Sequence, residues 1–83
     1  MAIWLYKIDL KDVWHNDELS FEEKRNEIVK RLRDSSWFKD SYSFELEDLI
    51  DWLELTGNVQ EFDHQFRYIY DLADEDRTWI ETF

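Results

Sequence analysis

The segment NVQEFDHQFRYIYDLA, residues 58–73, decides between two folds. Its apolar residues recur at intervals of four, three, one and three, which is typical of one buried helix face; they are Phe62, Phe66, Ile69, Tyr70 and Ala73. Asn58 followed by Glu61 indicates a helix N-terminus, because such side chains satisfy free backbone amides. Residues 65–72 also alternate with a period of two, so a middle strand that forms a hairpin through residues 74–76 is the alternative. We favour the helix, because the longer apolar series follows its period.

Two further helices are predicted upstream of this segment. Ser20 and Glu23 form a capping-box pattern, so a helix should cover residues 21–34. Ser43 is the best N-cap for the next helix, because acidic residues follow it where the helix dipole favours negative charge. Gly57 should close that helix. Its buried stripe is predicted to consist of Leu46, Leu49, Ile50 and Leu53.

Both ends of the chain have the pattern of strands. Residues 2–10 alternate, with Trp4, Tyr6, Ile8 and Leu10 on one side, and the tail RTWIETF, residues 77–83, is rich in Thr, Ile and aromatic residues. The predicted fold is a small single α+β domain, residues 1–83, in the order β-α-α-α-β, with the terminal strands paired and the helices on one face. A two-stranded sheet is marginal alone, so a homodimer that pairs strand edges is one alternative.

The composition limits the classes of function. With 43% hydrophobic and 18% aromatic residues among 83, the chain can form a core, which argues against intrinsic disorder. The absence of Cys excludes disulfides and thiolate zinc sites, and suits a cytoplasmic protein. A net charge of −11 argues against direct nucleic acid binding and against anionic membranes, so we expect a basic protein as the partner.

The negative charge is concentrated in the second half of the chain. Residues 40–83 contain two basic and thirteen acidic residues, which accounts for the whole net charge. Two sets of carboxylates are predicted to form an acidic face. One set lies on the outward side of the helix that follows Ser43 and consists of Glu47, Asp51 and Glu54. The other lies at the C-terminal end of the last helix, where the dipole disfavours negative charge, and consists of Asp71, Asp74 and Glu75.

Carboxylates one helical turn apart are separated by about 5–6 Å, which is comparable with the spacing of phosphates along a nucleic acid. The acidic face is therefore interpreted as a nucleic-acid mimic that binds a nucleic-acid-handling protein. The alternative is a solvated surface that only maintains solubility.

Three aromatic residues are candidates for an apolar contact patch: Trp14, Trp37 and Tyr42. The two tryptophans lie outside clear apolar stripes, and exposed aromatic side chains are typical of binding hot spots. The alternative is that each loop tryptophan folds back onto the core. Trp4, Trp52 and Trp79 are easier to place in or beside the core.

No motif for catalysis is present. His15 and His64 lie in no specific pattern, and the single glycine excludes phosphate-binding loops. The acidic run at residues 71–76 lacks the spacing of a calcium loop. We therefore predict no enzyme activity, no metal and no cofactor, with a small metal-dependent or acid–base enzyme as the alternative.

In its size, acidity, aromatic content and lack of Cys and Pro, the chain resembles the small acidic inhibitors made by bacteriophages, such as anti-CRISPR and antirestriction proteins. The resemblance is one of composition and assigns no role to individual residues. It implies a non-catalytic inhibitor that occupies the basic nucleic-acid-binding surface of its partner in the host cytoplasm. An immunity protein or antitoxin against a basic nuclease is the alternative.

Overall fold

The computed structural model describes residues 5–82, and its longest element is the helix α5 (Val59–Glu75). The strand alternative for residues 65–72 is therefore wrong. Asn58 Oδ1 accepts a hydrogen bond from the Glu61 amide at 2.9 Å, and Glu61 Oε2 accepts one from the Gly57 amide at 2.9 Å. These two side chains satisfy amides at the helix start, as the sequence predicts.

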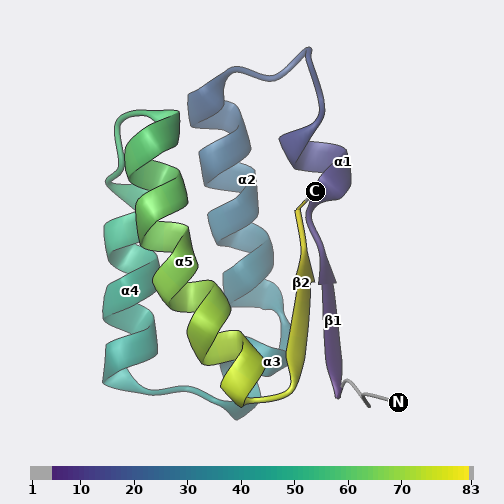
Figure 1. The fold of residues 1–83 in the computed structure, drawn as a ribbon, viewed down its shortest axis with the longest axis vertical. Coiled ribbons are helices and arrows are strands. Elements are labelled where there is room, and N and C mark those ends of the chain that lie inside the picture. Colours follow the sequence, from purple (N-terminus) through teal and green to yellow (C-terminus); the bar gives the residue numbers. More distant parts are fainter. Residues whose placement is uncertain (1–4, 83) are drawn as a thin grey trace.

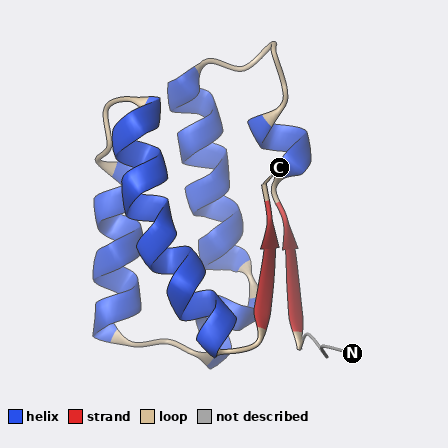
Figure 2. Ribbon diagram, viewed as in Figure 1, coloured by secondary structure: helices blue, strands red, loops and turns tan. Residues whose placement is uncertain are grey.

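The terminal strands pair beside a layer of helices. Figure 1 shows the three long helices α2, α4 and α5 together on one side of the strands, and Figure 2 shows the strands along one margin of the molecule. The strands are parallel, with Tyr6 opposite Thr78 and Asp9 opposite Glu81. Parallel strands require a long crossover, which the helices supply. The predicted α+β class with paired terminal strands is confirmed; the elements are β1 (Tyr6–Asp9), α1 (Lys11–Trp14), α2 (Phe21–Asp34), α3 (Ser36–Asp40), α4 (Phe44–Glu54), α5 and β2 (Thr78–Glu81).

The short elements differ from the prediction. The helices α1 and α3 were not expected, because four or five residues are too few to show a helical period. Both strands are shorter than the predicted ranges 2–10 and 77–83. Trp4 and Phe83, which were assigned to these strands, lie outside the described residues.

Gly57 does not close α4, which is a correction. The helix ends at Glu54, and Gly57 has no positive φ, so the left-handed glycine cap is absent. Instead, the Thr56 hydroxyl donates to the Leu53 carbonyl at 2.8 Å and the Thr56 amide donates to the same carbonyl at 3.2 Å. Thr56, one residue before Gly57, therefore satisfies a carbonyl at the C-terminal end of α4.

The core lies between the helices and one face of the sheet. Leu53 is fully buried as predicted, but Leu49 is only partly buried, because it lies at the margin where α4 meets α5. Tyr70 is 44% exposed, so its assignment to the buried stripe of α5 is wrong. Gln65 is buried instead and its amide donates to the Leu49 carbonyl at 3.3 Å. The buried apolar residues are Ile8, Leu10, Val13, Ile28, Val29, Leu32, Trp37, Leu46, Ile50, Leu53, Phe62, Phe66, Ile69, Ala73 and Ile80.

Arg31 connects the N-terminal elements to α2. Its guanidinium donates two hydrogen bonds to the Asp12 carboxylate, at 2.7 and 2.9 Å, and one to the Asp9 carbonyl at 3.2 Å. It also contacts Glu27 Oε1 at 3.3 Å, one turn earlier on the same helix. The hydrogen bonds from Arg31 lower the pKa of Asp12 below its ordinary value of 3.8.

We expect Asp12→Asn to lower the melting temperature at pH 7 and to have little effect at strongly acidic pH. A carboxyl whose pKa is lower in the folded chain contributes stability above its unfolded pKa and loses that contribution as the pH falls through its folded pKa. Melting curves at pH 7 and near pH 2 measure the difference. Glu18→Gln, at an exposed residue, is the control. A destabilisation by Asp12→Asn that is equal at both pH values would contradict this role.

Candidate functional site

The predicted carboxylate row of α4 is engaged within the protein. Arg33 from α2 donates to Glu54 at 2.8 Å and to Asp51, and the Tyr42 hydroxyl donates to Glu47. The hydrogen bond to Glu47 raises the pKa of Tyr42. Asp51 and Glu54 keep side-chain exposures of 53% and 47%, so the row still faces solvent, although Arg33 and Tyr42 already bind its carboxylates.

The predicted acids at the end of α5 are exposed and span about 100° of the helix surface. Asp71, Asp74 and Glu75 have no ion pair within residues 5–82. At 100° per residue, Glu75 lies on the side of α5 that carries Tyr68, whereas Asp74 lies on the side that carries Tyr70. Asp71 projects between them. The cluster therefore extends from the Tyr68 side of the helix toward the Tyr70 side.

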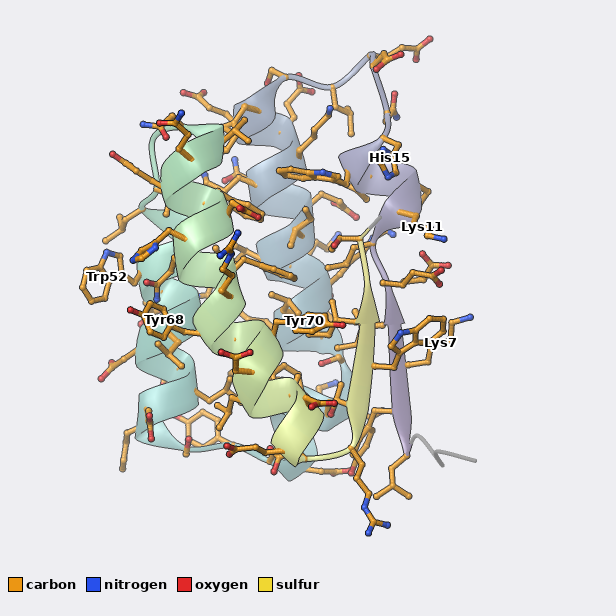
Figure 3. The ribbon with its side chains drawn as sticks, viewed as in Figure 1. Lys7, Lys11, His15, Trp52, Tyr68 and Tyr70 are labelled. Atoms are coloured by element: carbon orange, nitrogen blue, oxygen red, sulfur yellow. The ribbon has the colours of Figure 1, made fainter. Side chains whose placement is uncertain are left out.

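A shallow groove lies where α4 meets α5, with a volume of about 240 Å³. Leu49 from α4 and Tyr68 and Leu72 from α5 form its apolar lining, and Glu45 and Glu75 lie in the same groove. Trp52 follows Leu49 by one turn of α4. Tyr68 is 53% exposed and Trp52 is 65% exposed. Figure 3 shows both side chains on the α4 side of the molecule, away from the strands.

We call this surface the α4–α5 face: it comprises Glu45, Asp48, Leu49, Trp52, Tyr68, Asp71, Leu72 and Glu75. Asp48 and Asp71 are exposed and lie one turn from Glu45 and Glu75 respectively. Its four carboxylates make no ion pair in the part of the chain that the structure describes. The helix α4 contains no basic residue, so nothing on that helix offsets the negative potential.

Two side chains of α5, Arg67 and His64, are engaged within that helix. Arg67 forms a pair with Asp63 at 3.5 Å on the far side of that helix. The exposed His64 packs edge to face against Tyr68, with ring centroids 5.6 Å apart. An aromatic surface bordered by unpaired carboxylates can bind a partner that presents both apolar and cationic groups.

The aromatic candidates do not form one patch. Trp37 is fully buried, and Trp14 is partly buried and stacks on Phe62 with centroids 5.3 Å apart. For both residues the alternative interpretation, packing against the core, is the observed one. Tyr42, between α3 and α4, is 49% exposed and packs edge to face against Phe38 of α3.

Trp52 and Tyr68 were missed as surface residues, and Trp52 was placed in or beside the core. A signal for their exposure does exist in the sequence. Trp52 lies 200° around α4 from the buried Ile50, and Tyr68 lies 100° around α5 from the buried Ile69. Aromatic side chains off the buried stripe indicate an exposed contact surface.

His15 and His64 are both exposed. Across residues 5–82 no three His, Cys, Asp or Glu side chains are placed to hold a metal ion. None of the helices in that range combines the length and the apolar character needed to cross a membrane. Comparisons with protein-family models, with curated proteins and with solved structures find no match for this chain.

Proposed function

We propose that this protein is a non-catalytic binding protein that occupies the basic nucleic-acid-binding surface of another protein. The observation that carries the proposal is the α4–α5 face, in which unpaired carboxylates surround two exposed aromatic side chains. The carboxylates supply long-range attraction to a positive groove and accelerate association. Trp52 and Tyr68 supply apolar contact area, which holds the complex together once it has formed.

The arrangement of charge supports nucleic-acid mimicry more than a general solubility coat. On the side of α4 that meets α2, Arg33 pairs with Asp51 and Glu54 and offsets part of their charge, whereas Glu45 and Glu75, which share one groove, have no such partner among residues 5–82. Residues one turn apart on each helix repeat the negative charge at intervals of about 5–6 Å. Such a repeat can replace consecutive phosphates in a positive groove.

The test is capture of proteins from bacterial lysate on the immobilised chain, followed by elution with duplex DNA. We expect DNA to release basic nucleic-acid-binding proteins, and we expect rising salt to weaken their binding. If DNA releases no captured protein, nucleic-acid mimicry is wrong.

Charge reversal then locates the binding surface. Reversal of three acids on the α4–α5 face, Glu45→Lys with Asp48→Lys and Glu75→Lys, should weaken binding of a released protein about tenfold or more, which is ~1.4 kcal/mol. The matched control reverses three exposed acids elsewhere, Asp17, Glu18 and Asp34, and changes the net charge equally. Equal losses in the two triple variants would mean that only the total charge matters. Trp52→Ala should increase the dissociation rate while leaving the melting temperature unchanged.

A further inference from the structure

The outward side of α4 carries three large apolar side chains in addition to its acids. Phe44 is 81% exposed, Trp52 is 65% exposed and Leu55 is 80% exposed. At 100° per residue these three side chains fall within an arc of about 80°, with Asp48 between them. The buried residues of the helix lie on the opposite side, and they are Leu46, Ile50 and Leu53. We call this outward side the α4 ridge: it comprises Phe44, Asp48, Trp52 and Leu55.

The α4 ridge runs along the whole helix. Phe44 begins α4, and Leu55 directly follows its last residue with near-helical backbone angles of −89° and −4°. From Phe44 to Leu55 the rise is about 16 Å. The Trp52 ring has no stacking or cation–π partner among the described residues, and Figure 3 shows it projecting outward from α4. Single exposed apolar residues are normal, whereas three on one side of one helix indicate a contact surface.

The charge of the α4 ridge indicates the charge of its partner. Asp48 lies one turn from both Phe44 and Trp52. Neither Asp48 nor Glu45 forms an ion pair in the described part of the chain, and α4 contains no basic residue. A partner that covers the ridge therefore encloses the Asp48 carboxylate beside apolar side chains, which is unfavourable unless a cation pairs with it. The partner must supply that cation.

A second copy of this chain does not meet the requirement. Two ridges in contact would bring one Asp48 against the other, and α4 supplies no cation for either carboxylate. The net charge of −11 adds repulsion between the two copies. An anionic membrane surface is repelled in the same way.

The backbone of α4 determines which kind of element can bind to it. Its interior N–H and C=O groups are bonded to each other within the helix, so an added strand would find no backbone partner there. A helix satisfies its own backbone groups and needs only side-chain contacts. A row of side chains on one helix packs into the groove between rows on another helix. The α4 ridge is therefore suited to a second helix.

We propose that the α4 ridge binds an amphipathic helix of the basic partner, with apolar side chains at the two ends of the contact and an arginine between them. This inference rests on the proposed function, because it specifies which element of the partner contacts α4. Asp48 and Trp52 lie one turn apart, so one guanidinium can pair with the carboxylate while its plane lies on the indole ring. Phe44 and Leu55 then contact the apolar ends of the bound helix.

The test is isothermal titration calorimetry of the full chain with a synthetic helical peptide of about fourteen residues. One face of the peptide carries leucine at both ends and arginine in the middle, and the other positions are alanine and glutamine. We expect saturable binding that Leu55→Ala weakens at least about tenfold, ~1.4 kcal/mol. Leu5→Ala is the matched control, because Leu5 is a leucine that is 66% exposed outside the ridge. No binding at about 1 mM peptide, or equal binding to Leu55→Ala and the wild type, overturns the proposal.

A double-mutant cycle tests the contact between Asp48 and the arginine. Asp48→Asn should weaken binding of the arginine peptide and should have little effect on a peptide in which glutamine replaces the arginine. Glu75→Gln is the control, because it removes one carboxylate from the α4–α5 face but lies on α5. Equal losses in the two variants would show that only overall charge attracts the peptide, and would contradict the role of Asp48.

This inference and the proposed function fail separately. If duplex DNA releases proteins captured on the immobilised chain but the peptide does not bind, the proposed function stands and the helix inference is wrong. If the peptide binds but DNA releases nothing, nucleic-acid mimicry is wrong and the α4 ridge remains a site for basic helices. If the peptide does not bind and Leu55→Ala abolishes self-association in sedimentation equilibrium, the ridge pairs two copies of the chain and the helix inference is wrong.

Discussion

Trp37→Ala should lower the free energy of unfolding by about 3–5 kcal/mol. Trp37 is the largest fully buried side chain, and its loss leaves a cavity that the short helix α3 cannot fill. Its Nε1 also donates to Asp76 at 3.4 Å, so the substitution removes a link between α3 and the end of α5. Against a total of about 5–15 kcal/mol, such a loss brings the domain close to unfolding.

Urea denaturation followed by circular dichroism measures this loss. Trp52→Ala is the matched control, because the same ring is removed from a position that is 65% exposed. We expect the control to change stability by no more than about 0.5 kcal/mol. If the two tryptophan variants lose similar free energy, then the positions of Trp37 and Trp52 in this fold are wrong.

Local sequence signals predicted the long helices well. The N-caps Ser20, Ser43 and Asn58 each accept a hydrogen bond from the amide three residues ahead, as expected. A capping interaction involves only one turn of chain, so the residue types and their spacing determine it. Four of the five apolar residues predicted for α5 are buried for the same reason, since the period depends on helix geometry, and Tyr70 is the exception.

Trp37 illustrates where sequence reasoning fails. It lies in a helix of five residues, which is too short for an apolar period, and its burial depends on contacts with distant elements. The start of this helix had a signal that was missed, because the Ser35 hydroxyl accepts from the Phe38 amide at 3.2 Å. The parallel direction of the strands likewise depends on the whole helical crossover.

The candidate site shows the same division between local and long-range information. The sequence indicated that acids are concentrated after residue 40, and the exposure of Asp71 and Glu75 is as expected. It did not indicate that Arg33, eighteen residues before Asp51, pairs with the acids on one side of α4. Which carboxylates remain unpaired depends on how α2, α4 and α5 pack, so the α4–α5 face emerges only from the fold.

Deletion of residues 77–83 should unfold the domain. The deletion removes β2, whose Thr78 and Ile80 are buried, together with the buried Thr82. It also removes the carbonyls of Arg77 and Glu81, which accept from the amides of Leu5 and Leu10 at 3.1 and 2.7 Å. Without this strand, Ile8 and Leu10 lose one side of their packing, and β1 loses its only strand neighbour among the described residues. Circular dichroism should then show no cooperative thermal transition.

The full-length variant Trp79→Ala tests whether the effect of the deletion comes from loss of the whole strand or only from loss of the Trp79 side chain. Trp79 lies on the sheet face that the helices do not cover, next to Lys7, and its side chain is only partly buried. We expect this variant to retain a cooperative melt and to lose about 1 kcal/mol, near the average for point substitutions. A truncated chain that still melts cooperatively would show that the helices form a stable domain without the sheet. In that case the domain would not need β2 for its stability, even though the strand pair covers one side of the core.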